Sequence, residues 1–439
     1  MFVTGRLALL IGIGVVPVAL LSAAGGGSAP IAWAVALAWL VGAEGAAVVD
    51  ALLAADPRRV RVDRELPARV RLGEPVAVRV RVVNTGRRRL AGMLRDGWEP
   101  TAGAEPDRAA LDVPAGEARD VTIGLRPRRR GERRAAFVAV RSRGPLGLAG
   151  RQAVLAQPAS VRVLPPFASR RHLPSRLQRL RELDGSTSVL VRGRGTEFDS
   201  LREYVRGDDV RSIDWRATAR SRTTMLRTWR PERDRHVVIV VDTGRTSAAR
   251  VGDGTRLDAD IEATLLLAAL ADRAGDHVHV LCVDRVVRAR VTGARGAALL
   301  PALVDALAGV EPQLIDTDWE TATREAARFT TRPSLIVALT AADAAAASRS
   351  LLGALPAWTA KARVLVAAAT DDEIEVAAQE RHTSEDIWLA AAAERTLADA
   401  RGLARMFVRL GADALTATPE RLPPLVADRY LELKARGGL

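Results

Sequence analysis

The segment GTEFDSLREYVRGDDVRSIDWRATARSRTTMLRTWRPERDRHVVIVVDTGRTS, residues 195–247, decides the fold of this chain. Its closing run, 236–241, is continuous valine and isoleucine after one histidine, and it stops at Asp242. An unbroken apolar run of this length is typical of a strand buried on both faces of a parallel sheet. The residues before this run point to a membrane, and those after it predict an α/β domain.

The first part of the segment predicts a short helix. Phe198, Leu201 and Val205 fall on one helical face, with Asp199 or Ser200 as the N-cap.

A second short helix is predicted after a turn at Gly207, with Asp208 or Asp209 as its N-cap. In that helix Asp214 and Trp215 are exposed to a neighbouring element. The run 223–229 that follows favours a β-strand, because threonine and tryptophan fit a pleated surface.

Carboxylates and arginines alternate through this segment. The acidic members are Glu197, Asp199, Glu203, Asp208, Asp209 and Asp214, and the basic members are Arg202, Arg206, Arg211, Arg216, Arg220 and Arg222. Their spacing permits repeated bidentate pairing. The alternative is a solvated surface, in which each exposed pair contributes about 0 to 1 kcal/mol.

The string G-x-E-F-x-x-x-R-x-Y-x-x-G-D-D-x-R-x-I-D-W-x-x-x-A-R, residues 195–220, resembles the bacterial domain-of-unknown-function family fifty-eight. GDD-R-IDW at fixed spacing makes the resemblance specific rather than compositional. Members are typically membrane-anchored and encoded beside MoxR-type AAA+ ATPases, so the resemblance implies such an ATPase as partner. The motif positions expected to bind that partner or to hold the structure are Glu197, Arg202, Tyr204, Gly207, Asp208, Asp209, Arg211, Asp214, Trp215 and Arg220.

The resemblance also implies that the domain after Asp242 is similar to a von Willebrand factor A domain, in which the pattern D-x-S-x-S holds a divalent ion. Asp242 and Thr246 match its first and last positions, and Gly244 replaces the first hydroxyl. Thr317 matches the threonine of a second loop. Because Mg²⁺ prefers hard oxygen ligands, it is the ion expected at such a degenerate site.

A further carboxylate is expected after the run 334–340 but is missing. Ala341 and Ala342 stand there, and Asp343 is displaced. A metal-free interaction loop is therefore the alternative to a metal site.

Two apolar runs, 7–24 and 31–55, are each near the ~20 residues that span a bilayer. Residues 25–30 form an uncharged turn, and arginines flank only the outer ends, so both ends are expected in the cytoplasm. The predicted location is the bacterial plasma membrane with cytoplasmic soluble domains. A cleaved signal peptide is the rival interpretation of the first run. Glu44, inside the second run, is expected to snorkel or to pair in protonated form across the hairpin.

Residues 58–166 change to an alternating apolar and polar pattern, which predicts an immunoglobulin-like β-sandwich. The predicted strands are 60–62, 75–84, 118–126, 135–142, 152–156 and 160–165. Arginine runs at 87–89 and 128–130 fall in turns, where they are expected to meet water or lipid headgroups.

From residue 236 strands alternate with helices, which predicts a parallel sheet covered on both faces. The predicted strands are 236–241, 277–283, 286–292, 333–340, 363–369 and 413–417. The predicted helices start near 257, 296, 318, 343, 384 and 419. The fold class is α/β: a von Willebrand A-like doubly wound sheet after an immunoglobulin-like sandwich and a transmembrane hairpin. The expected domains are 1–57, 58–166, 167–234 and 235–439.

Several chemistries are excluded or disfavoured by the sequence. No G-x-x-x-x-G-K-[ST] or G-x-S-x-G motif occurs, and the single cysteine, Cys282, permits no internal disulfide. His277 and His279 show no zinc-ligand spacing and are expected to form a surface pair. An enzymatic function such as hydrolysis is disfavoured, because the sequence shows no nucleophile together with a general base.

The favoured function is a membrane-anchored interaction or adaptor protein working with a MoxR-type ATPase. The alternative is an arginine-rich binder of anionic lipid or nucleic acid, since the net charge is +13. Only 4% of residues are aromatic, so stacking platforms for single-stranded nucleic acid are scarce.

Overall fold

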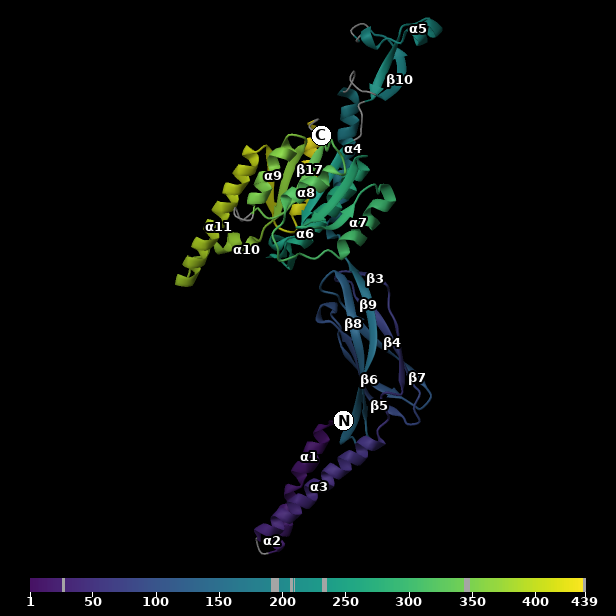
Figure 1. Ribbon diagram of the computed structural model, residues 1–439, viewed down its shortest axis with the longest axis vertical. Coiled ribbons are helices and arrows are strands. Elements are labelled where there is room, and N and C mark those ends of the chain that lie inside the picture. Colours follow the sequence, from purple (N-terminus) through teal and green to yellow (C-terminus); the bar gives the residue numbers. More distant parts are fainter. Residues whose placement is uncertain are drawn as a thin grey trace. The chain divides into compact units, whose positions relative to one another are not determined.

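The structure is a computed structural model that describes residues 1–25, 28–190, 197–205, 208, 210–230, 235–342 and 348–436. The chain forms two compact units, Met1–Leu164 and Pro165–Leu439 (Figure 1).

The first unit begins with an apolar helical hairpin. Its elements are β1 (Phe2–Val3), α1 (Gly5–Ile13), α2 (Val15–Ala24) and α3 (Ala29–Leu53). Gly14 separates α1 from α2, and a Cβ at that position would lie 2.2 Å from the Trp39 ring of α3. The Trp39 indole N–H donates a 3.0 Å hydrogen bond to the Leu10 carbonyl, which fixes the pairing of the two arms.

Two described helical segments, Gly5–Ala24 and Ala29–Leu53, are long and apolar enough to cross a membrane. Both lie near the N-terminus, and by length and composition they weakly suggest membrane anchoring. Glu44 of α3 is exposed, and no described residue donates a hydrogen bond to it or forms an ion pair with it. The expected pairing of Glu44 across the hairpin is therefore wrong, because the α3 face packed on α1 carries Ala43 and Ala47 instead.

The rest of the first unit is a β-sandwich. Its further elements are β2 (Val60–Glu65), β3 (Arg69–Arg71), β4 (Val76–Asn84), β5 (Leu90–Trp98), η1 (Pro100–Ala102), β6 (Arg108–Val113), β7 (Ala118–Leu125), β8 (Gly131–Arg143) and β9 (Ala149–Leu164). One sheet has the order β1-β9-β8-β5-β6 with β3 beside β9, and the other has the order β2-β4-β7. Their facing side chains form one core.

The predicted strands of the sandwich are present, but 152–156 and 160–165 belong to the single strand β9. The sequence missed β3, β5 and β6. Gly92 and Gly97 interrupt the alternation of β5, although Gly92 is required: a Cβ there would lie 1.9 Å from the Arg141 carbonyl oxygen of β8.

Asp50, in the last turn of α3, fastens the hairpin to the loop between β8 and β9. Its carboxylate accepts N–H groups from Leu146 at 2.7 Å, Leu148 at 2.7 Å and Ala149 at 3.0 Å. Gly144 permits this approach, because a Cβ there would lie 2.3 Å from the Asp50 carboxyl carbon. The Gly-Pro-Leu-Gly-Leu turn is thus shaped to hold the end of a helix.

The second unit is built on one six-stranded sheet with the order β16-β15-β12-β17-β18-β19. The strands are β12 (His236–Asp242), β15 (His277–Val283), β16 (Val287–Val291), β17 (Leu335–Leu339), β18 (Arg363–Ala369) and β19 (Ala412–Ala417). All neighbours are parallel except β15 and β16. The six predicted strands are confirmed; four of them, β12, β15, β17 and β18, are buried strands that require continuous apolar runs.

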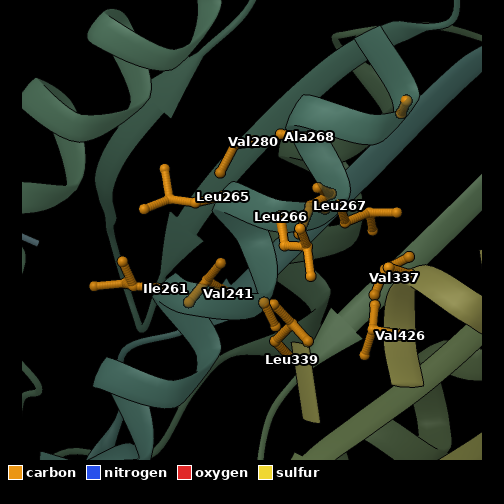
Figure 2. Packing of buried hydrophobic residues seen from close by; sticks show 14 of the residues in the cluster. Val241, Ile261, Leu265, Leu266, Leu267, Ala268, Val280, Val337, Leu339 and Val426 are labelled. Atoms are coloured by element: carbon orange, nitrogen blue, oxygen red, sulfur yellow. The ribbon is translucent and has the colours of Figure 1, made fainter. Parts of the chain in front are cut away.

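Helices cover both faces of this sheet. The first face carries α6 (Arg256–Arg273), α7 (Leu299–Ala308) and α12 (Leu422–Ala435), and the second carries α8 (Trp319–Ala327), α9 (Arg349–Thr359) and α11 (Ser384–Arg409). Figure 2 shows α6 packing on the sheet, with Leu266 near Val241 and with Val426 contributed by α12. The helix predicted near 343 begins at Arg349, and 343–347 lie outside the described residues.

Shorter elements complete the second unit. They are η2 (Ala168–His172), α4 (Leu173–Leu190), β10 (Glu197–Glu203), η3 (Val210–Ser212), α5 (Trp215–Ser221), β11 (Met225–Arg230), η4 (Arg245–Ala248), β13 (Arg250–Val251), β14 (Gly254–Thr255), η5 (Gly296–Ala298) and α10 (Asp372–Ala377). The connector packs on the α/β body, since the Glu262 carboxylate of α6 accepts the N–H groups of Ala168 and Ser169, each at 2.9 Å. Arg176 of α4 also pairs with Asp428 of α12 at 2.6 Å.

Candidate functional site

Asp242 ends the central strand β12 and is the focus of a hydrogen-bonded cage. Its Oδ1 accepts the Gly244 N–H at 2.7 Å and the Thr317 hydroxyl, and its Oδ2 accepts the hydroxyls of Thr246 at 3.1 Å and Thr340 at 2.6 Å. We call these five residues the Asp242 cage. The structure therefore brings together Asp242, Thr246 and Thr317, the three residues predicted as a metal site.

Thr340 is a member that the sequence analysis missed. It follows β17 directly and is only 4% exposed. The von Willebrand A pattern predicts a carboxylate just after this strand, where the sequence has Ala341 and Ala342, and it does not point to the preceding threonine. A hydroxyl at the end of a strand adjacent to β12 was the available signal, because the carboxyl ends of parallel neighbours meet at one edge.

The cage joins the loops at this edge of the sheet into one surface. Backbone bonds run from the Arg245 N–H to the Ile315 carbonyl at 2.8 Å and from the Gln313 N–H to the Thr243 carbonyl at 2.7 Å. The Arg245 side chain then pairs with Asp316 at 2.5 Å, and both side chains are more than half exposed. Asp242 itself is 2% exposed, so its loops rather than its carboxylate face the solvent.

The motif segment before β12 forms a separate ribbon. β10 pairs antiparallel with β11, with Glu197 opposite Arg230 in register. The helix predicted from Phe198 to Val205 is therefore wrong. The apolar spacing of this segment covers only about two helical turns. Pairing with the β-prone strand β11 gives its backbone a ladder of hydrogen bonds instead.

Asp214 is the N-cap of α5 rather than an exposed contact residue. It accepts the N–H groups of Arg216 at 2.9 Å and Ala217 at 3.0 Å, and Arg227 of β11 donates to it at 2.8 Å. The Ala217 N–H and then the Arg227 guanidinium lower the pKa of this carboxyl. Trp215 beside it is 70% exposed, as predicted.

The predicted ion-pair network is partly present. Arg202 donates to Asp208 at 2.7 Å, and Asp208 also accepts the Val205 N–H at 2.9 Å, so this pair closes the turn after β10. The hydrogen bond that Arg202 donates to Asp208 raises the pKa of the Arg202 guanidinium. The Tyr204 N–H donates to the Thr224 carbonyl at 2.8 Å, which continues the ribbon.

Two further motif residues, Arg211 and Arg220, are exposed on η3 and α5. Gly207 and Asp209 lie outside the described residues, as does Asp343 of the predicted metal site. In the described part of the motif, the contacts include those of a turn, a helix cap and a two-stranded ribbon.

Residues 200–393 match the family described as "Protein of unknown function DUF58". The match supports the family that the string at 195–220 predicted, and it covers both the ribbon and the Asp242 cage. No curated protein is significantly similar to the chain.

Three solved structures are similar to about a quarter of this chain. The CARDB domain of the PF1109 protein from Pyrococcus furiosus, solved in complex with di-metal ions, is 15% identical over 25% of this chain and 94% of its own, with a TM-score of 0.18. A β-glucosidase from Listeria innocua in complex with glucose is 16% identical over 25% of this chain and 16% of its own, with a TM-score of 0.18. The native conformation of Escherichia coli α-2-macroglobulin is 16% identical over 24% of this chain and 6% of its own, with a TM-score of 0.19. Scores this low carry no argument about function.

The described residues around Asp242 do not fit a divalent ion at the cage. The four hydrogen bonds to Asp242 occupy the roughly four acceptor positions of a carboxylate. A serine in place of Gly244 has no room, because its Cβ would lie 2.2 Å from the Thr317 hydroxyl oxygen. The adjoining cavity of about 10 Å³ has space for about one water. Among the residues placed by the structure, no group of three His, Cys, Asp or Glu side chains is disposed to hold a metal.

A second buried carboxylate, Asp284, follows the neighbouring strand β15. It accepts the Thr243 hydroxyl at 3.1 Å and the Arg288 guanidinium at 2.6 Å. Burial opposes its ionisation, but the Arg288 hydrogen bond and two backbone N–H groups outweigh burial and lower its pKa. Asp284 is thus paired with Arg288, and it supports the cage by accepting a hydrogen bond from Thr243, the residue after Asp242.

Asp260 of α6 is a third acidic group near the cage and is fully buried. Neither of its oxygens has a hydrogen-bond partner. Burial raises its pKa well above the usual value; nearby Arg256 opposes this rise and the charge on Asp242 adds to it. Burial thus favours the protonated form of Asp260.

Proposed function

We propose that this protein is a membrane-anchored interaction or adaptor protein, and that the surface around the Asp242 cage binds a protein partner. The observation that supports the proposal most is the convergence of three threonine hydroxyls on Asp242. This convergence fixes three loops and leaves their outer side chains exposed to solvent, where they can make contacts. A surface held rigid before binding loses less conformational entropy when a partner docks.

The outer side chains of these loops have the composition of a protein-binding surface. Leu314 is 82% exposed beside the exposed Arg245–Asp316 pair. An apolar anchor with flanking charges is a common arrangement at protein interfaces. We call Arg245, Leu314 and Asp316 the rim.

The proposed partner is a MoxR-type AAA+ ATPase, and the α/β unit is proposed to be von Willebrand A-like. The support is the family resemblance together with the position of Asp242 at the carboxyl end of a central parallel strand. An enzymatic role is not proposed, because the cavity of about 10 Å³ at the cage cannot admit a substrate.

Affinity capture from native membranes tests this function. Arg245→Glu with Leu314→Asp is expected to lose a partner that the unaltered chain retains, because the variant reverses a charge and removes the apolar anchor. Arg381→Glu is the matched control, since Arg381 forms an exposed pair with Glu394 away from the rim. Retention of every captured protein by the rim variant would contradict the proposal.

Binding of anionic lipid is the second candidate, because Arg88 lies beside the end of α3 and donates to the Leu52 carbonyl at 2.6 Å. Its neighbour Arg89 is paired with Asp112, and Arg128 of the other run is paired with Glu105 at 3.0 Å. These pairs reduce the charge available to phosphates. Binding to anionic vesicles that falls steeply with added salt would favour this candidate.

A further inference from the structure

A second exposed surface of the α/β unit is a groove of about 630 Å³ lined by α10, α11, the residues after β18 and the segment 249–251. Its floor is aliphatic. The floor residues are Ile374, Leu389, Ala393, Leu397, Ala400 and Ala404. Five of the six lie on α11 at spacings of three or four residues, so they share one helical face. We call this surface the α11 groove; Figure 1 shows α10 and α11 together at one side of the sheet.

The groove is long rather than round. Its α11 wall runs from Leu389 to Ala404, which is about 22 Å at ~1.5 Å per residue. Alanine predominates along it, so another backbone can approach closely. At the Leu389 end, Trp388 is 79% exposed and lies one helical turn before Ala392 of the groove lining. A groove of this length matches a helix of about four turns.

Both walls carry charges that the described residues leave unneutralised. Glu373 and Glu375 of α10, Arg250 of β13 and Arg401 of α11 also line the groove, and none of the four forms an ion pair with a described residue. The segment 371–380 contains acidic side chains and no basic one. This local acidity is notable in a chain with net charge +13.

We propose that the α11 groove binds an amphipathic helix of a protein partner, with an aliphatic stripe, a lysine- or arginine-bearing flank against α10 and an acidic flank against Arg250 and Arg401. The aliphatic floor requires the stripe, and the opposite charges of the walls require opposite flanks. Glu373 and Glu375 repel phosphates, so a lipid surface or a nucleic acid fits this groove poorly. The inference rests on the proposed interaction function and adds to it the chemistry of the partner.

Binding of a synthetic 15-residue helix to the full chain in detergent micelles tests the inference. The probe carries leucines at helical spacing, lysines on one flank and glutamates on the other. A scrambled peptide of the same composition, which has no aliphatic stripe, is its control. Fluorescence anisotropy is expected to show binding of the amphipathic probe only.

Two groove variants have matched controls close by in the chain. Ala400→Trp fills the floor, whereas Ala398→Trp places the same side chain on an exposed position outside the groove. Glu373→Lys with Glu375→Lys reverses the wall, whereas Glu380→Lys with Glu385→Lys makes the same charge change outside it. Each groove variant is expected to weaken probe binding about tenfold or more, with the controls unchanged.

The inference is overturned if the probe does not bind, if the scrambled peptide binds equally, or if groove variants and controls behave alike. It is also overturned if the groove variants lose binding to anionic vesicles rather than to the probe. These outcomes are separable from the proposed function. Loss of a membrane partner by the rim variant, with groove variants unaffected, would retain the interaction role and remove the groove from it.

Discussion

At the scale of single residues, the Asp242 cage shows how hydrogen-bond donors can surround a buried carboxylate. An isolated carboxylate is costly to bury, but hydrogen bonds to it offset that cost. Asp242 receives its hydrogen bonds from the ends of different loops, so each hydroxyl also determines where a loop lies. The cage should therefore be sensitive to the loss of one hydroxyl.

Thr340→Val tests this view, because valine keeps the shape of threonine and removes the hydroxyl. A hydrogen bond to a charged group contributes about 1.5–3 kcal/mol, so the variant should lose roughly that much local stability. Hydrogen exchange of the β12 and β17 amides in the full chain provides the measurement. Thr359→Val is the control, since its hydroxyl donates only to the carbonyl groups of its own helix.

A second single-residue effect concerns His279, which was expected on the surface but is 6% exposed. It stacks on Phe329 with ring centroids 5.2 Å apart, and its Nδ1 lies 2.7 Å from the Thr292 hydroxyl oxygen. Burial, and then the neighbouring His236, His277 and Arg295, lower its pKa to about 4. The sequence could not show this, because the covering aromatic ring comes from a helix end fifty residues away.

The lowered pKa of His279 predicts a pH dependence of stability. The unfolded chain takes up a proton near pH 6.5, whereas the folded protein resists protonation until about pH 4. Stability contributed by neutral His279 is therefore complete above pH 6.5 and is lost as the pH falls from 6.5 toward 4. His279→Gln should flatten the fall in thermal stability over that interval. An unchanged slope between pH 7 and pH 4.5 would show that His279 does not control it.

At the scale of elements, the hydrophobic pattern predicts those strands that are buried on both faces, and local spacing fails where a distant partner decides. The run ending at Asp242 could only be a central strand. Phe198, Leu201 and Val205 fit a helix by spacing, but Phe198 and Leu201 lie in β10, which pairs with β11, and Val205 follows that strand. In the sandwich, Gly92 interrupts the alternating pattern by which β5 could have been predicted. Glycine is needed there because β8 approaches closely, and this contact cannot be read from the local sequence.

The junction of α3 with the β8–β9 loop is the element-scale contact that the sequence did not predict. Asp50→Ala would leave three backbone N–H groups without their acceptor, and a loss of about 3 kcal/mol is expected. Faster hydrogen exchange at Leu146 and Leu148 would report it in micelles. Glu44→Gln on the same helix is the control, since Glu44 bonds no described residue.

At the scale of the whole molecule, the arrangement of the hairpin leads to a prediction of sidedness. Thr4 and Asp50 both bind the β8–β9 loop, so the two outer ends of the hairpin lie together. The turn at its other end carries no charge, and arginines occur only beyond the outer ends. By the positive-inside rule, the outer ends of the hairpin, the β-sandwich and the second unit should share the cytoplasmic side.

Single cysteines can test this sidedness, because the native Cys282 is buried and should resist labelling. In intact cells, Ser28→Cys at the turn should react with a membrane-impermeant maleimide, since the turn would face outward. Leu146→Cys in the β8–β9 loop should react only after the cells are opened, because its side chain is 56% exposed but would face the cytoplasm. The reverse pattern would place the rim and the α11 groove outside the cell, where a cytoplasmic AAA+ ATPase could not reach them.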